Sequence, residues 1–552
     1  MKTAISTAVL AIIVLALPAR EATARQDGQA DHMLHAGPTA TAPLYTTLGN
    51  HARKISTDSD GAQQYFDQGL RLQFAFNHAE AIRSYETALA QDASCAMCWW
   101  GIALAYGPNI NAPMDEASGR LAYEAIGNAK RLAENVTPLE RGLIDALAER
   151  YAEDPAAERA PLDRAYADAM TELANQYPDD DDVLTLHASS MMNLNPWNYW
   201  SGDYGSRTPN DGTPELLASL EKALALNRTN PGACHYYIHA VEAAHPERAV
   251  ECAERLAALM PGAGHIVHMP GHIYIRVGRY RDAVTANDHA VHSDETYIAD
   301  QSPMGLYPMA YYPHNYHFMA FAATLAGMGE KAMGAAEVVA PKVPKEIAMA
   351  VTFIQNVVVL PQLTAVTFGD WETILEYPMP DPDLGVATAM AQYARGVAKA
   401  ALGDFAGAEA ERAALSATIA EFDPDGEHPV LRIAGLSLDG EIALRSGDAD
   451  AAVEAFAAAT EIEDGMRYEE PPLWYYPVRH SLGVAQLAAG QNAEAEASYR
   501  YDLERFPDNG WSLFGLAQAL EAQGKTDEAE RVRNEFAEAW QYADVELTGS
   551  RF

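Results

Sequence analysis

Histidines gather in the middle of the sequence at spacings of three and four residues. Such spacings place side chains on one face of a helix, within about 60° of each other, because successive residues are about 100° apart. The groups are His235, His239 and Glu242; His265, His268 and His272; and His314 and His317. Imidazole together with a carboxylate is a ligand set that suits zinc, copper, iron or nickel.

The spacing alone does not identify the chemistry. A His-x-x-x-His pair on a helix is typical of zinc proteases, but the glutamate that follows the first histidine in those enzymes is missing here. Two helices with such pairs could hold three or four ligands around one or two metal ions, with an open position for water activation or redox chemistry. Glu242 is the candidate general base or further ligand. A metal-free polar groove and plain packing remain the alternatives.

Polar and aromatic residues beside the histidines predict a ligand groove. Its candidate residues are Tyr236, Tyr274, Arg276 and Tyr312. Arg276 follows His272 by one helical turn, and a guanidinium beside a metal would suit a ligand that carries a carboxylate.

The helices that would position these residues form short repeats. From about residue 62 onward, apolar residues recur at helical spacing and strand signals are nearly absent. A glycine precedes an alanine by five residues in five places: Gly278 and Ala283, Gly403 and Ala408, Gly447 and Ala452, Gly490 and Ala495, and Gly524 and Ala529. Small residues at fixed offsets let paired helices approach closely, so the pattern resembles the tetratricopeptide repeat, with its period of about 34 residues.

The repeat register places histidines at equivalent positions. His265 and His314 lie thirteen residues before Gly278 and Gly327, and His268 and His317 lie ten residues before the same glycines. In tetratricopeptide proteins the first helix of each pair lines the concave groove. The resemblance therefore implies that these histidines face the groove from neighbouring repeats.

Longer motifs also carry a family resemblance. HYYIHAVE, GHIVHMPGHIYIRVGRY and YYPHNYHF, together with CWWGIALAYGPNINAP, resemble motifs of a family of bacterial tetratricopeptide-repeat proteins that are often exported. The likeness covers roughly residues 60–330, and the rest resembles generic repeats. It implies an all-α fold, a right-handed α-solenoid of helix-turn-helix repeats. It implies no reaction, so no catalytic residue carries over from it.

The chain divides into four predicted parts. Residues 1–24 have the charge, apolar run and A-x-A site of a secretory signal peptide. Residues 25–61 are predicted to be a flexible arm, residues 62–345 a solenoid with the histidine-rich groove, and residues 346–545 further repeats. Polar or aromatic segments at residues 107–114, 195–214 and 293–313 interrupt the repeats, and such insertions often cover a binding surface.

Net charge and cysteine content indicate which partners and which cellular compartment the sequence favours. The net charge is -39, from 77 acidic and 38 basic residues, which disfavours nucleic-acid partners and anionic membranes. No segment after the signal is long and apolar enough for membrane insertion. Four cysteines permit disulfides in an oxidising compartment, and Cys95-x-x-Cys98 is read as a local disulfide or two buried thiols. The aspartates at 179–182 are predicted to cap a helix.

The sequence therefore predicts a periplasmic or secreted solenoid that binds a protein or small-molecule partner in a His-lined groove, with a transition metal such as zinc, copper or iron. The alternative is a metal-dependent hydrolase or oxidoreductase that uses the same cluster. Whether the chain is an enzyme stays open. A buried cluster under aromatic loops would favour the enzyme, and a wide open groove would favour the binding protein.

Overall fold

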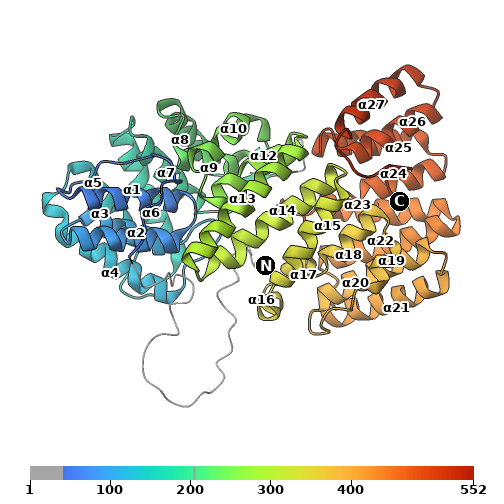
Figure 1. The fold of residues 1–552 in the computed structure, drawn as a ribbon, viewed down its shortest axis with the longest axis horizontal. Coiled ribbons are helices and arrows are strands. Elements are labelled where there is room, and N and C mark those ends of the chain that lie inside the picture. Colours follow the sequence, from blue (N-terminus) through green and yellow to red (C-terminus); the bar gives the residue numbers. More distant parts are fainter. Residues whose placement is uncertain (1–40, 203–206) are drawn as a thin grey trace, which may run out of the picture. The chain divides into compact units, whose positions relative to one another are not determined.

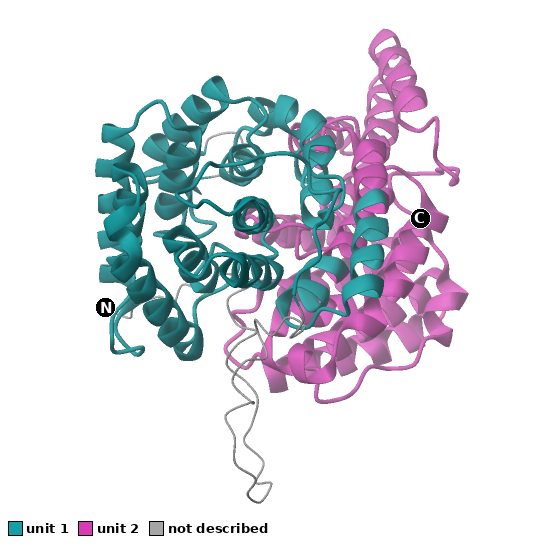
Figure 2. Ribbon diagram, turned by 60° about the vertical axis from the view of Figure 1, so that its left-hand side comes forward, with its two compact units in different colours: residues 1–202, 207–273, 289–312 teal, residues 203–206, 274–288, 313–552 magenta. Residues whose placement is uncertain are grey.

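The computed structural model describes residues 41–202 and 207–552. The predicted signal peptide and residues 25–40 of the predicted arm lie outside these described residues. The described chain forms two compact units, drawn in different colours in Figure 2. The first unit contains residues 41–202, 207–273 and 289–312, and the second contains residues 274–288 and 313–552.

The first unit is built from helices and one pair of two-residue strands (Figure 1). Its elements are α1 (Asp60–Phe74), α2 (His78–Gln91), α3 (Ala96–Tyr106), α4 (Glu116–Leu132), η1 (Ala133–Asn135), α5 (Pro138–Ala148), α6 (Arg159–Gln176), α7 (Asp181–Met192), β1 (Trp200–Ser201), β2 (Thr208–Pro209), α8 (Thr213–Leu226), α9 (Pro231–Val241), η2 (Pro246–Ala249), α10 (Val250–Leu259), α11 (Gly264–His268) and η3 (Tyr307–Tyr311). Strands β1 and β2 pair antiparallel. Three helices contribute residues to both units: α12 (Pro270–Arg276), α13 (Tyr280–Gln301) and α14 (Tyr312–Leu325), of which Tyr312 alone belongs to the first unit.

The second unit is helical throughout its described residues. Its elements are α14 (Tyr312–Leu325), α15 (Gly329–Val339), η4 (Ala340–Lys342), α16 (Lys345–Ala350), η5 (Thr352–Ile354), α17 (Gln355–Val358), α18 (Leu360–Phe368), α19 (Trp371–Glu376), α20 (Gly385–Ala401), α21 (Phe405–Phe422), α22 (Pro429–Ser446), α23 (Ala449–Asp464), α24 (Arg479–Ala488), α25 (Asn492–Arg505), α26 (Gly510–Ala522) and α27 (Thr526–Ala539).

Consecutive helices pair as a tetratricopeptide solenoid requires. Close pairs include α1 with α2, α3 with α4, α20 with α21, α22 with α23 and α26 with α27. The five glycines that precede an alanine by five residues all lie at turns and have positive φ, between 73° and 94°. We call this spacing the offset rule. Glycine adopts this left-handed conformation without the steric cost of a Cβ, which explains why it recurs at the turn between paired helices. The predicted all-α solenoid fold is confirmed.

A tyrosine held between two glycines joins successive repeats. Tyr85 of α2 lies against Gly69 of α1 and Gly101 of α3, where an added Cβ would overlap its ring. Tyr499 of α25 lies in the same way against Gly483 of α24 and Gly515 of α26. In these two joints the second helix thus inserts a large residue between two first helices, which explains why small and large residues recur at fixed spacing there.

The interrupting segments differ in part from the prediction. Residues 107–114 are outside any helix, and the described residues of the second segment, 195–202 and 207–212, contain only the short β1–β2 pair. The third segment is largely helical, because α13 continues to Gln301 and η3 covers Tyr307–Tyr311. The compact units are interleaved in sequence, because the second contains residues 274–288 as well as the residues after 312. The long α13 helix places residues on both sides of the division between them, which repeat counting could not reveal.

Part of the predicted arm is held against the first unit. Residues 41–59 have no regular secondary structure, but Arg53 bonds both Asp180 and Asp182. The nitrogen Nε2 of His51 lies 2.9 Å from Oδ1 of Asp182. Asp180 also accepts from the Val183 N–H as the N-cap of α7, so the predicted capping role is confirmed.

Replacing His51 with glutamine is expected to cost more stability at about pH 6 than at about pH 9. Burial lowers the pKa of His51, but the hydrogen bond and charge of Asp182 outweigh it and leave this pKa above the ordinary value of 6.5. The stabilisation is therefore fully present below pH 6.5 and is lost as the pH rises through the folded-state pKa. We expect a loss of about 1.5–3 kcal/mol at pH 6.

Chemical denaturation at both pH values measures this difference. The exposed His289 provides the control, since His289→Gln removes an imidazole from the surface of α13. An equal loss for His51→Gln at the two pH values would contradict the protonated ion pair.

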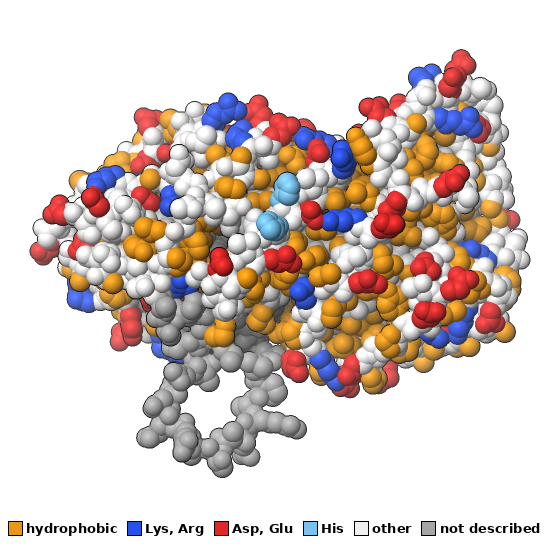
Figure 3. Space-filling view, viewed as in Figure 1, with side chains coloured by type: hydrophobic (Ala, Val, Ile, Leu, Met, Phe, Trp, Pro, Cys, Tyr) orange, Lys and Arg blue, Asp and Glu red, His pale blue; other side chains and the backbone are white. Residues whose placement is uncertain are grey.

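Two disulfides lie within the first unit. They join Cys95 to Cys98 and Cys234 to Cys252, so the second ties α9 to α10 beside His235. None of the helices in the described ranges has the length and apolar character needed to cross a membrane. Acidic side chains are scattered over the face drawn in Figure 3, as expected of a solvated surface.

Candidate metal centre

Six of the predicted ligands converge inside the first unit. They come from the first helices of two successive pairs, α9 and the α11–α12 segment. Pro270 interrupts that segment between His268 and His272, because proline supplies no N–H for a continuous helix. The exposed fractions range from 0% to 3% for His235, His239, Glu242, His265, His268 and His272.

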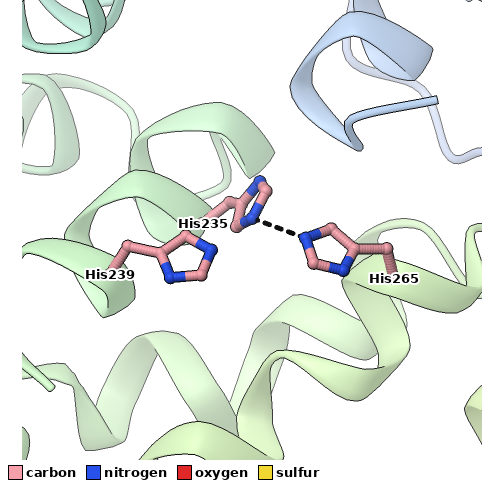
Figure 4. A group of neighbouring side chains, drawn as sticks. All are labelled: His235, His239 and His265. Atoms are coloured by element: carbon pink, nitrogen blue, oxygen red, sulfur yellow. Dashed lines mark hydrogen bonds between the residues drawn. The ribbon is translucent and has the colours of Figure 1, made fainter. Parts of the chain in front are cut away.

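Three imidazoles form the core of this cluster (Figure 4). His235, His239 and His265 each offer a ring nitrogen within 4.8 Å of the others. The Nε2 atoms of His235 and His265 are 3.1 Å apart. Two nitrogens bound to one tetrahedral zinc ion lie about 3.3 Å apart, since each bond is about 2.0–2.1 Å long. The three rings therefore approach the spacing of a three-histidine metal site.

His235 and His239 each have a hydrogen-bond acceptor beside Nδ1. This partner fixes the ring proton on Nδ1 and leaves a lone pair on Nε2, which points into the cluster. Nδ1 of His235 is 2.6 Å from the Phe74 carbonyl oxygen, which can only accept, so this nitrogen carries the proton. Nδ1 of His239 donates to Oε1 of Glu242 at 3.0 Å. Metal-binding histidines commonly donate their other ring N–H to a carbonyl or carboxylate in this way.

The inward nitrogen of His239 has no other use in the described structure. Its Nε2 atom is buried and has no hydrogen-bond partner there, and Figure 4 shows that edge of the ring facing the other two imidazoles. A buried acceptor without a partner is costly, and such atoms are rare in native proteins. A cation between the three rings would satisfy it. His265 would then carry its proton on Nδ1, which also lacks a partner.

Glu242 orients two imidazoles at once. Its Oε1 accepts from His239, and its Oε2 lies 2.6 Å from Nδ1 of His272. Both carboxylate oxygens are thus engaged by ring N–H groups. This arrangement favours an orienting role for Glu242 over the predicted roles of ligand or general base, although His239, Glu242 and His272 also lie close enough to share a cation.

A second pair of imidazoles lies next to the first three. The Nε2 atoms of His268 and His272 are 2.7 Å apart, the distance of an N–H···N hydrogen bond. The ring centroids of His265 and His268 are 5.9 Å apart, and those of His239 and His272 are 5.4 Å apart. The pair therefore extends the cluster.

The three core imidazoles are uncharged at neutral pH. Burial lowers the pKa of His235, His239 and His265 well below the ordinary 6.5, and the charge that a protonated neighbour would carry lowers it further. Neutral imidazole is the form that binds metal ions, so no proton has to be displaced at pH 7.

A hydrogen-bonded roof of three segments covers the cluster. Nε1 of Trp197 donates to Oδ1 of Asn111 at 3.1 Å, and Nδ2 of Asn111 donates to Oη of Tyr311 at 3.0 Å. The Trp197 ring lies 5.0 Å from the His239 ring, and the Tyr311 ring lies 4.6 Å from the His265 ring. All three interrupting segments thus contribute a residue to this roof, as the prediction of a covered binding surface required.

Two aromatic residues that lie against the cluster, Trp197 and Phe76, have strained backbones. Trp197 and Phe76 have φ values of 61° and 57°, in the left-handed region that large side chains rarely adopt. Phe76 occupies the turn position between α1 and α2, five residues before Ala81, where later repeats have glycine. Its ring lies 4.5 Å from the His235 ring and 5.5 Å from the His265 ring. Such strain costs about 1–3 kcal/mol and is typical of functional sites.

A small cavity of about 20 Å³ lies beside Phe76 and Tyr236. Three lining atoms are buried without a hydrogen-bond partner among the described residues: Oε1 of Gln73, Nη2 of Arg150 and Oδ1 of Asn193. This volume accepts about one water molecule, or one end of a small polar ligand. Donor and acceptor groups together would suit a carboxamide or a similar group.

The remaining predicted residues are spread over both units. Tyr236 is buried in α9, 5.8 Å from the Phe76 ring, and Tyr312 donates to Glu295 in the first unit. Tyr274, Arg276, His314 and His317 belong to the second unit. There the Arg276 guanidinium lies over the Tyr468 and Phe506 rings, with centroid distances of 5.4 and 5.8 Å.

Sequence reasoning missed residues that support the site. Phe74, Phe76, Asn111 and Trp197 hold or cover the imidazoles, yet none has a chemical signature by itself. The offset rule did contain the signal for Phe76, because it marks residue 76 as a turn position that should favour glycine.

Comparison with protein families identifies a repeat in the C-terminal part of the chain. A tetratricopeptide-repeat family model matches residues 486–535. No curated protein matches the chain. A structure of the IFIT1 monomeric mutant with Gppp-AAAA is 12% identical, with a TM-score of 0.31, and 88% of this chain and 91% of that chain are covered. The structure of APC/C hetero-tetramer Cut9-Hcn1 is 13% identical, with a TM-score of 0.29 and coverage of 89% and 76%.

Proposed function

We propose that this chain is an exported solenoid that holds a transition metal ion between His235, His239 and His265, and that it binds a partner or small ligand. One observation carries the metal site: Nε2 of His239 is buried without a hydrogen-bond partner and faces two other imidazoles. A plain packing histidine would have both ring nitrogens satisfied. His187 illustrates that case, because Thr171 and Ser219 hydroxyls contact its two nitrogens.

The donor set narrows the choice of metal. Three neutral imidazoles with no thiolate suit zinc, copper or iron better than calcium or magnesium, which prefer oxygen ligands. Export is supported by the signal-like N-terminus and by the two cysteine pairs. The repeat fold supports a binding role, because solenoids present extended surfaces to partners.

Elemental analysis of the full chain, purified from its own compartment and also titrated with zinc, copper and iron salts, tests the proposal. We expect close to one tightly bound transition metal ion for each chain. A protein that neither retains such an ion nor takes one up in titration would overturn the metal centre.

Replacing Glu242 with glutamine is expected to lower the metal affinity by about 10–100-fold, the usual effect of losing an orienting partner. The amide offers only one acceptor, so it cannot take N–H groups from both His239 and His272. Competition with a chromogenic chelator measures the change. Glu247→Gln, at a largely exposed glutamate nearby, is the control and should retain full affinity. Unchanged affinity in Glu242→Gln would contradict its orienting role.

A metal-dependent enzyme is the second candidate. It is favoured by the burial of the cluster beneath Phe76 and Trp197, and by the polar cavity beside Phe76. A three-histidine site leaves a coordination position open, where a bound ion could activate water or exchange electrons. In such an enzyme the chain's residues would exclude bulk water and orient the substrate through Arg150 and Asn193.

The two candidates predict different results for a variant without the ion. Metal-loaded protein and His265→Ala are compared on panels of ester, amide and phosphate substrates and for oxygen uptake. Turnover that is present in the loaded protein and absent in the variant would establish the enzyme. A binding protein would show no turnover in either sample.

A further inference from the structure

The final segment of the second unit is buried, although it has no regular secondary structure. Ser550 and Arg551 have exposed fractions of 0% and 6%, and Leu547 has 7%. The end of the chain lies within the second unit in Figure 2. An extended segment with a buried arginine needs an explanation, because a cation in an apolar interior is costly unless its surroundings compensate it.

First helices of successive pairs contact this segment. Phe552 lies 5.8 Å from the Trp511 ring of α26, and its carbonyl oxygen accepts from Arg445 of α22. Phe552 also lies against Gly369, which follows α18. Residues 547–552 therefore lie along the inner layer of the repeats, where tetratricopeptide solenoids present their concave surface.

Two hydrogen bonds hold the Ser550 hydroxyl, one to the Tyr499 hydroxyl and one to the His480 carbonyl oxygen. The Tyr499 hydroxyl lies 2.6 Å from Oγ of Ser550, and this Oγ donates to the His480 carbonyl oxygen at 3.1 Å. Tyr499 belongs to a second helix, but its ring passes between Gly483 and Gly515 and so brings its hydroxyl to the inner layer. A larger residue at either glycine would block that path.

Arg551 lies in a cage of aromatic rings. Its guanidinium carbon is 4.0 Å from the centroid of the Tyr476 ring. Tyr475, Tyr393 and Glu441 lie near the same cation, and Glu441 also accepts from Nε of Arg445 at 3.1 Å. Nε and Nη1 of Arg551 make no hydrogen bond in the described structure. The contact that recognises Arg551 is thus the face of the Tyr476 ring, a typical means of binding a cation.

We propose that this cage and the adjoining inner surface form a peptide-binding site for a partner segment with a small residue, arginine and an aromatic residue in succession. Residues 547–552 of the chain itself occupy the site as a displaceable stand-in. We call the site, which comprises Tyr393, Glu441, Arg445, Tyr475, Tyr476 and Trp511, the tail site. It is separate from the proposed metal centre and does not depend on it.

Two features favour a peptide partner over a permanent internal contact. The guanidinium leaves two donors unused, so the segment does not satisfy the site fully and a better ligand can replace it. Tyr476 offers its ring face to a cation and Trp511 lies beside an aromatic ring, which suits a peptide with adjoining cationic and aromatic residues. With residues 547–552 removed, the aromatic surface would be exposed, and exposed patches of this kind mark interaction sites.

A fluorescent peptide of sequence LTGSRF tests the proposal by anisotropy. The probe is expected to bind the chain that lacks residues 547–552. It should bind the full chain more weakly, because the tethered segment competes at an effective concentration of about millimolar, and the difference is about 100-fold if the probe's dissociation constant is about 10 μM. A peptide with alanine in place of arginine should bind at least about 10-fold more weakly, as should Tyr476→Ala in the shortened chain. Tyr476→Phe keeps the ring face and should retain binding.

Three results would overturn the proposal. The first is a shortened chain with the circular dichroism and monomer size of the full chain that does not bind the probe at about millimolar concentration. The second is equal binding of the arginine and alanine peptides. The third is a full-length dimer that dissociates on removal of the segment, which would assign the tail site to a second copy.

A shortened chain that fails to fold leaves Arg551→Ala in the full chain as the deciding variant. This substitution keeps the Ser550 and Phe552 contacts but empties the cage. The folded variant should bind the probe at least about 10-fold more tightly than the unmodified chain. No gain in binding would show that residues 547–552 are a permanent part of the fold.

Discussion

His239→Ala is expected to lower the affinity for a divalent transition metal by more than about 100-fold. The substitution removes the one core nitrogen that is buried, partnerless and aimed at the other two imidazoles. Losing a direct ligand should exceed the effect of losing an orienting partner, which is about 10–100-fold. Titration of the metal-free protein, with competition by a chelator of known affinity, measures the change.

His187→Ala is the matched control for this prediction. His187 is also a buried histidine of the first unit, but hydroxyl groups contact both of its ring nitrogens. The control should lose stability and retain metal binding. If His239→Ala retains its affinity while folded, the three-histidine centre is contradicted and the metal, if any, lies elsewhere.

Tyr85→Ala is expected to destabilise the protein by about 3–5 kcal/mol, the range for truncating a large buried aromatic. Tyr85 is fully buried and fills the space between Gly69 and Gly101, so its loss leaves a cavity where three helices meet. This joint also holds α1 against α2, the two helices that flank the turn with Phe76. Denaturant unfolding, followed by a probe of the first unit, measures the loss.

Tyr85→Phe separates the packing of the ring from its hydroxyl. Oη of Tyr85 is buried without a partner among the described residues, so removing it should change the stability by less than about 1 kcal/mol. Gly101→Ala should destabilise by about 1–3 kcal/mol, because the added Cβ overlaps the ring. Equal losses for the alanine and phenylalanine variants of Tyr85 would refute the packing argument.

The fold could be predicted largely because its rules are local. The offset between Gly490 and Ala495, repeated elsewhere, reflects a backbone requirement at each turn and a close contact of paired helices. The extent of α13 was less accessible, since its polar second half satisfies helix geometry without a clear apolar stripe. The boundary between compact units depends on long-range packing, which a single sequence does not reveal.

The sequence predicted which histidines form the site but not which groups their ring nitrogens contact. Spacing placed His235 and His239 on one helical face, and the structure brings them to His265 as expected. Spacing could not tell that both oxygens of Glu242 are engaged by imidazoles, because that depends on the break at Pro270 and the resulting position of His272. The Phe74 carbonyl was equally hidden, since a backbone acceptor has no signature in the sequence.

The left-handed backbone at Phe76 carries a strain that only glycine would remove. Glycine would adopt φ of 57° without that strain, a gain of about 1–3 kcal/mol. It would also remove a ring that is 4% exposed and lies against His235 and His265, a loss of about 3–5 kcal/mol. A laboratory selection for survival at high temperature should therefore not recover Phe76→Gly, and natural lineages should keep an aromatic residue at this turn.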